Sequence, residues 1–180
     1  MLFIKDEKEL LVEYEYATDA PKYIVYRESG WSHQCCVAVV RRVFGGRRSS
    51  DGENSEFEPT KQNAFPEEWV DNPPEGLDYL SEDRYFAIFR TEQRAREIVH
   101  QLLVEDARKS LDSAYNYYYA CTGCGDDGYG DMECDLAGSH LFTKLVEAKK
   151  LYGEDLAETI EDICQKAHIN ISELQKQEEE

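Results

Sequence analysis

The chain has 180 residues, of which 41% are hydrophobic and 12% aromatic, so it is long enough to bury one well-filled core. Its formal net charge of -18 argues against direct binding to a nucleic-acid backbone, because phosphates repel so negative a surface, and it favours basic partners. The sequence has neither an apolar run long enough to span a membrane nor the basic start and apolar core of a signal peptide. We therefore expect one soluble, cytoplasmic domain over residues 1–180, without membrane association.

Hydrophobic patterning predicts about four strands in the first half of the chain. Residues 10–16 alternate between apolar and acidic side chains, as a half-buried strand does. Residues 23–27 and 34–43 are rich in Val, Tyr and Ile, and the segment between them fits a hairpin connection. Residues 85–89 form the fourth predicted strand.

Residues 44–80 are dominated by Gly, Ser, Asn, Pro and Glu, and this stretch is longer than the loops of compact domains. Its composition predicts an acidic insertion that is either a solvated loop or a docking segment. The docking hypothesis rests on Phe57, Phe65 and Trp69, which lie among acids and would anchor a basic partner that the carboxylates attract. The candidate partner-binding residues are Glu56, Glu58, Glu67, Glu68, Trp69 and Asp71.

Four arginines lie on either side of Gly45-Gly46, namely Arg41, Arg42, Arg47 and Arg48. Arginines beside a flexible glycine turn can hold a phosphate through paired hydrogen bonds, which makes this turn a candidate anion site. The alternative is that the acidic segment downstream neutralises them or that they solubilise an edge of the sheet. No Walker-type glycine loop accompanies them.

The second half of the chain has the periodicity of helices. Thr91 is placed to cap a helix whose apolar positions recur as far as Tyr118. Such a helix would be about 30 residues and roughly 45 Å long, so we predict a break near Ser110 or Ser113. Two shorter helices follow, with apolar positions from Leu141 to Tyr152 and from Leu156 to Ala167, and Gly153 separates them.

These elements together predict an α+β fold. The strands are predicted early in the chain and the helices late. An antiparallel sheet of about four strands covered by the C-terminal helices would bury the apolar faces of both. We also expect a zinc-knuckle-like loop after the long helix and a frayed acidic tail over residues 175–180.

The spacing C-x2-C-x9-C-x5-H predicts that loop, with Cys121, Cys124, Cys134 and His140 as the four ligands of a structural zinc. A closed tetrahedral site would stabilise the fold and do no chemistry. His140 is the weakest assignment, and the residues that could replace it are His33, Cys35, Cys36 and Cys164. The alternative interpretations are reduced thiols and a redox-active pair, and the acids that follow Cys124 disfavour the reactive thiolate that a redox pair needs.

We assign no catalytic residue and expect a non-enzymatic regulatory or inhibitory protein. Its acidic surface would dock on a basic surface of another protein, such as a nucleic-acid-binding groove, as small acidic antagonists of viral or mobile-element type do. The alternative is a small-ligand or nucleotide-binding enzyme that holds an anionic substrate at the Arg41–Arg48 turn. A structural role in a larger assembly is the third class, and the oligomeric state stays open.

Overall fold

The structure is a computed structural model that describes residues 10–12, 22–28, 37–45, 65–84, 86–123 and 131–176. The chain divides into two compact units, Met1–Leu103 and Val104–Glu180. A 32-residue helix, α2 (Glu92–Gly123), contributes residues to both units. The interpretation of residues 1–180 as one domain stays a prediction.

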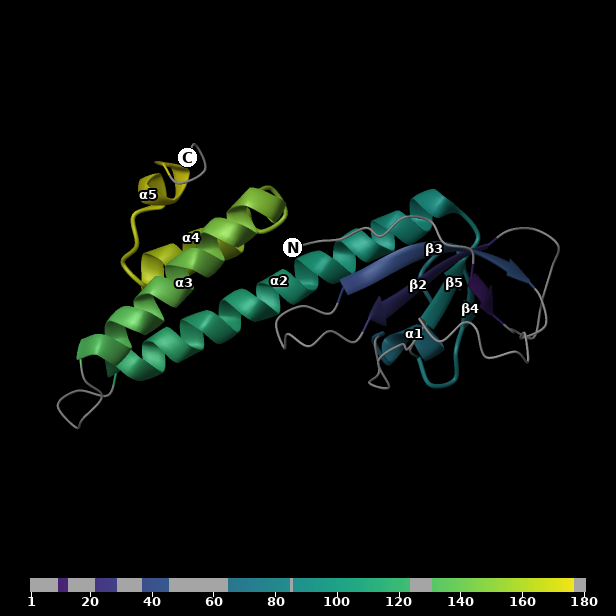
Figure 1. Cartoon of the computed structure of the whole chain (residues 1–180), viewed down its shortest axis with the longest axis horizontal. Helices are drawn as coiled ribbons and strands as arrows, with labels where there is room; N and C mark the ends of the chain where they lie inside the picture. Colours follow the sequence, from purple (N-terminus) through teal and green to yellow (C-terminus); the bar gives the residue numbers. More distant parts are fainter. Residues whose placement is uncertain are drawn as a thin grey trace. The chain divides into compact units, whose positions relative to one another are not determined.

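The first unit contains a five-stranded sheet in the order β1-β3-β2-β5-β4. Its strands are β1 (Leu10–Val12), β2 (Lys22–Glu28), β3 (Val37–Gly45), β4 (Leu77–Leu80) and β5 (Phe86–Phe89). β2 lies between β3 and β5, antiparallel to both, and β4 pairs antiparallel with β5 (Figure 1). β1 runs parallel to β3.

The sheet confirms the mixed helix-and-sheet class with antiparallel strands, and it corrects two details. First, β1 is parallel to its neighbour, so the expectation of a wholly antiparallel sheet is wrong at that edge. Second, α1 (Glu68–Asp71) and β4 lie inside the segment 44–80, for which the composition predicted an insertion without strands or helices, either a solvated loop or a docking segment. β4 is short and follows two prolines, so its strand conformation comes from pairing with β5 rather than from a local pattern.

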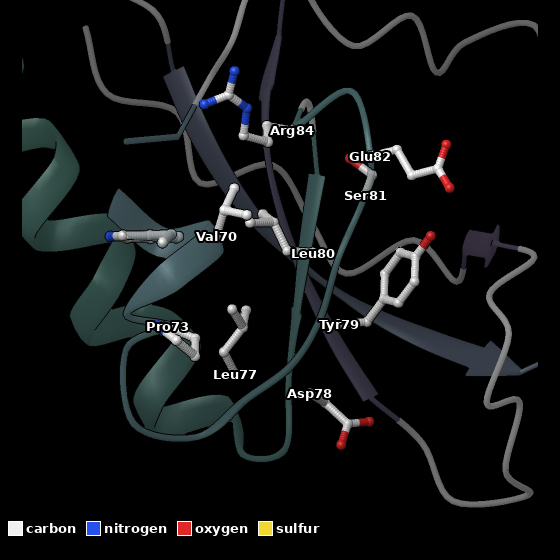
Figure 2. Close-up of a pocket in the computed structure, with 10 residues that line it drawn as sticks. Val70, Pro73, Leu77, Asp78, Tyr79, Leu80, Ser81, Glu82 and Arg84 are labelled. Carbon is white, nitrogen blue, oxygen red and sulfur yellow. The ribbon is translucent and has the colours of Figure 1, made fainter. Parts of the chain in front are cut away.

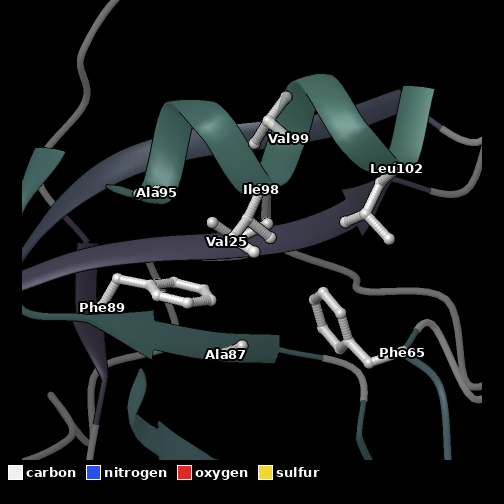
Figure 3. Packing of buried hydrophobic residues seen from close by; sticks show 8 residues of the cluster. All are labelled: Val25, Phe65, Ala87, Phe89, Ala95, Ile98, Val99 and Leu102. Atoms are coloured by element: carbon white, nitrogen blue, oxygen red, sulfur yellow. The ribbon is translucent and has the colours of Figure 1, made fainter. Parts of the chain in front are cut away.

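The core of the first unit lies between the sheet and the first turns of α2 (Figure 3). Val25 of β2 and Phe89 of β5 pack against Ile98 of α2, and all three side chains are fully buried. The buried positions of this half of α2 are Ala95, Ile98, Val99 and Leu102, which is the spacing of one helix face. Burying each large aliphatic side chain of this stripe contributes roughly 1.5–3 kcal/mol.

Thr91 caps α2 as the sequence predicts, because the Arg94 backbone N–H donates a hydrogen bond to the Thr91 hydroxyl oxygen at 3.3 Å. The predicted break in α2 is wrong: the helix is continuous through Ser110 and Ser113. The helix belongs to both units: Ile98 and Leu102 are buried in the first, and Leu111 and Ala114 are buried in the second.

The second unit is helical and consists of residues 104–123 of α2 together with α3 (Asp131–Tyr152), α4 (Ala157–Lys166) and α5 (Ile171–Lys176). α3 packs against both α4 and α5. The fully buried large side chains are Leu111, Leu141, Leu145, Leu156 and Leu174.

The two predicted C-terminal helices are confirmed, with Gly153 directly after α3, but α3 begins ten residues before Leu141. The end of α5 at Lys176 overlaps the tail predicted to fray, and residues 177–180 lie outside the described residues. No helix in the described part of the chain is both long and apolar enough to cross a membrane.

Candidate functional site

The acidic residues predicted to bind a partner lie at α1. Glu67 precedes this four-residue helix, Glu68 begins it and Asp71 ends it, and all three side chains are exposed. Glu56 and Glu58 lie outside the described residues. The structure therefore places three of the predicted carboxylates together on one short surface element.

Of the aromatic residues in this segment, Phe65 and Trp69 pack in the core of the first unit, and Phe57 lies outside the described residues. Phe65 is only 3% exposed, so its interpretation as a partner anchor is wrong and it belongs to the core. Trp69 stacks on Phe65 with ring centroids 5.1 Å apart and meets Phe89 edge to face at 6.4 Å. These contacts fix α1 to the sheet, because aromatic pairs in such geometries add about 0.5–1.5 kcal/mol beyond area burial.

A shallow, open groove of about 370 Å³ lies beside α1 and β4 (Figure 2). Its apolar lining includes Val70, Pro73, Leu77 and Leu80, which gather between the helix and the strand in Figure 2. Val70 is 64% exposed, the largest exposure of a hydrophobic residue in this part of the unit. The remaining lining residues are Trp69, Asp78, Tyr79, Ser81, Glu82 and Arg84.

The surroundings of this groove are strongly acidic. Residues 67–84 contain seven acids, namely Glu67, Glu68, Asp71, Glu75, Asp78, Glu82 and Asp83, and one base, Arg84. The base is neutralised, since its guanidinium lies 3.4 Å from the Glu67 carboxylate, and Arg90 lies 3.3 Å from Asp78. Within the described part of the chain, five exposed acids of this segment have no ion pair, namely Glu68, Asp71, Glu75, Glu82 and Asp83, and of these Glu82 lines the groove.

Backbone contacts to neighbouring elements hold the walls of the groove. Gly76 adopts a positive φ of 81°, and its carbonyl accepts a hydrogen bond from the Arg90 backbone N–H at 3.1 Å. The carbonyl of Glu75 accepts a hydrogen bond from the Arg94 guanidinium at 2.9 Å, which ties the start of β4 to α2. The approach to β4 is thus fixed from both β5 and α2.

The turn between β4 and β5 closes the other end. The Ser81 side chain is buried, and its hydroxyl oxygen accepts a hydrogen bond from the Phe86 backbone N–H at 3.3 Å. The Ser81 N–H in turn donates to the Phe86 carbonyl at 3.1 Å. Tyr79 stacks on Phe86 with ring centroids 5.8 Å apart. This end is therefore built from a paired turn that presents Glu82 and Asp83 to solvent.

The cysteine segment is only partly described. Cys121 is buried in the last turns of α2, and the Cys134 thiol of α3 donates a hydrogen bond to the Cys121 carbonyl at 3.2 Å. Cys124 lies outside the described residues, so the four predicted ligands cannot be compared as a set. Among the residues that the structure does describe, no group of three metal-ligating side chains comes together.

His140 is exposed on α3, and the same continuous helix contains Cys134. Six residues of α-helix rise about 9 Å, whereas neighbouring ligands of one tetrahedral zinc lie within about 4 Å of each other. Cys134 and His140 would therefore share a zinc only if α3 were interrupted between them.

Cys164, one of the alternative ligands, lies in an apolar setting in α4 and is 1% exposed. Burial raises the pKa of the Cys164 thiol, and the nearby Lys149 ammonium offsets part of this increase. The Lys149 Nζ atom is itself buried and has no hydrogen-bond partner in the described structure. A buried thiol with a raised pKa is a poor metal ligand and a poor nucleophile.

The arginine turn is also only partly described. Arg41 and Arg42 belong to β3, where they pair with Ile24 and Tyr23 of β2. Arg47 and Arg48 lie outside the described residues. The anion site stays a prediction.

Sequence reasoning located the acids of α1 but missed the apolar floor of the groove. Val70, Leu77 and Leu80 are three scattered aliphatic residues in a segment of acids and prolines, and they come together through the packing of α1 by Trp69 and the pairing of β4 with β5. The one local signal was Val70, an aliphatic residue in the middle of an acidic helix. In comparisons with known proteins, no family model, no curated protein and no solved structure matches this chain.

Proposed function

We propose that this protein is a non-enzymatic regulatory or inhibitory interaction module whose acidic α1–β4 surface docks on a basic surface of another protein. The observation that carries this proposal is the groove itself, whose apolar floor lies beside two elements, α1 and the turn after β4, that carry acids without ion pairs. An apolar floor supplies affinity on burial, and the carboxylates supply orientation and attraction.

The charge distribution supports a basic partner in particular. Residues 67–84 alone carry six more acids than bases, in a chain whose formal net charge is -18. Such a field accelerates encounter with a cationic surface and suppresses encounter with anions, an effect that fades beyond a screening length of about 8 Å at physiological salt. A nucleic-acid-binding groove of another protein has the required charge, and a protein that covers it would act as an inhibitor.

The test compares two variants that change the net charge equally. Glu67→Gln/Glu68→Gln/Asp71→Asn removes the three carboxylates of α1, and Glu154→Gln/Glu158→Gln/Glu161→Gln removes three exposed carboxylates of the second unit. Binding to a fluorescent lysine-rich peptide is measured by anisotropy at low and physiological salt. The α1 variant should bind about tenfold more weakly than the control and with a shallower salt dependence. Equal binding by both variants would mean that only the global charge matters and would refute docking at α1.

We also propose that a structural zinc is held by Cys121, Cys124 and Cys134; His140, the predicted fourth ligand, would join them only with α3 interrupted between Cys134 and His140. The short contact between Cys134 and the Cys121 carbonyl supports a shared site for these two cysteines. Native mass spectrometry before and after chelation should show one zinc per chain that chelation removes. Cys134→Ala should abolish zinc retention. Retention in His140→Ala would assign the fourth position to another residue, and a metal-free native chain would refute the site.

A further inference from the structure

We propose that the α1–β4 groove binds a short segment of the partner in which one apolar side chain is flanked by lysines or arginines. This inference rests on the proposed docking function and names what the surface recognises. The juxtaposition of an open apolar floor with the unpaired acids of α1 and of the turn after β4 carries it.

The floor sets the requirement for an apolar side chain. Val70 leaves 64% of its surface exposed, and Pro73, Leu77 and Leu80 line the same hollow. A purely cationic ligand would leave this apolar surface exposed to water, so it would not gain the binding free energy that burial of the surface provides. The volume of about 370 Å³ admits a large aliphatic or aromatic side chain with its adjoining backbone.

The rim sets the requirement for flanking cations. Glu68 and Asp71 belong to α1, whose Val70 lines the groove, and Glu82, in the turn after β4, lines the groove itself. Glu67 and Asp78 already form ion pairs with Arg84 and Arg90. The acids that have no such pair are therefore the ones that can bind cationic side chains of a partner. Because α1 and the turn after β4, which both border the floor, carry unpaired carboxylates, cations are favoured on both sides of the apolar residue.

The openness of the groove favours a segment of a protein over a small molecule. Small ligands usually bury 70–90% of their surface in an enclosing pocket, a condition that this shallow hollow does not meet. A peptide compensates by spreading its contacts over several residues. A second copy of this chain is disfavoured as the occupant, because its net charge of -18 would bring acid against acid.

The experiment uses the full-length chain with Trp31→Phe, which leaves Trp69 as its single tryptophan, since the chain has only two. Trp69 lines the groove, so its emission reports occupancy. The probes are the amidated peptides KKKLKKK and KKKSKKK, titrated at physiological salt. We expect the leucine peptide to shift Trp69 emission to shorter wavelength and to bind about fivefold more tightly than the serine peptide, which corresponds to about 1 kcal/mol.

The matched variant is Val70→Ser, which removes the exposed aliphatic group without changing charge and is not expected to disturb the core. Far-UV circular dichroism verifies its fold. It should bind the leucine peptide about fivefold more weakly and the serine peptide unchanged. Substituting Asp83→Asn and Glu82→Gln should weaken both peptides equally, because these acids would contact the lysines in either probe.

The outcomes separate this inference from the proposed function. If the two peptides bind equally and Val70→Ser has no effect, while the α1 triple variant still weakens both, the groove floor is not recognised and only the acidic docking surface survives. If the α1 triple variant binds both peptides as its control does, the docking function itself fails. A dimer in sedimentation that Val70→Ser dissociates would assign the groove to a second copy of the chain and would overturn the peptide proposal.

Discussion

Lys149 offers the sharpest test of the packing of the second unit. Its ammonium nitrogen is buried on α3 and has no hydrogen-bond partner among the described residues. The Cys164 thiol lies nearby, and it stays protonated at neutral pH because burial raises its pKa. An unsatisfied buried polar group costs about 1–3 kcal/mol, and a charged group costs more. Methionine has a similar length and needs no partner. Lys149→Met should therefore stabilise the protein by about 1–3 kcal/mol.

For a chain of this size, each kcal/mol corresponds to a rise in Tm of about 2–4 °C, which thermal unfolding followed by far-UV circular dichroism resolves. The control is Lys150→Met, which makes the same change at the exposed neighbouring position of α3 and should shift Tm by less than about 2 °C. Hydrogen exchange of the α3 and α4 amides gives a local readout and should slow only in Lys149→Met. A loss of stability in Lys149→Met with a neutral Lys150→Met would refute the reasoning, because it would mean that the ammonium makes an interaction that the fold requires.

Two further predictions concern a glycine and a thiol. Gly76→Ala should destabilise the first unit by about 1–2 kcal/mol, because Gly76 has a φ of 81° and a Cβ there would lie 3.1 Å from the Arg94 Cγ atom. Gly138→Ala is the control within α3, where a Cβ would be 3.7 Å from the Tyr118 ring, and it should stabilise by roughly 0.5–1 kcal/mol in urea unfolding. Equal effects of the two substitutions would contradict the strain assigned to Gly76. For Cys164, the pKa in the folded state is raised above its ordinary value of 9.0, so the unfolded chain releases the thiol proton first as pH rises. The folding free energy should therefore be independent of this group below pH 9.0 and become less favourable above it, and Cys164→Ala should show a shallower decline towards about pH 10. Parallel pH profiles for the two proteins would contradict a buried, protonated thiol.

The sequence by itself determined the elements whose signal is local and periodic. Ala95, Ile98 and Leu102 recur at helical spacing after a capping Thr91, and the structure places them against the sheet on a capped helix. The β-branched runs of β2 and β3 predicted their strands for the same reason, since a two-residue or 3.6-residue repeat is visible without knowledge of the partner that buries it. The acids of α1 were also found from sequence, because charge needs no tertiary context to be recognised.

Only the tertiary structure decided the features that depend on distant contacts. β4 is a strand because β5 pairs with it, and the parallel pairing of β1 with β3 has no signature in either segment. α2 continues past Ser110, and its residues are buried in both units, with Ile98 in the core of the first and Leu111 buried in the second. The floor of the groove combines Val70 of α1 with Leu80 of β4, and its only base is neutralised by Glu67 across a separation of seventeen residues. Such a site exists only once pairing and packing bring its parts together, whereas a sequence pattern records only neighbours along one element.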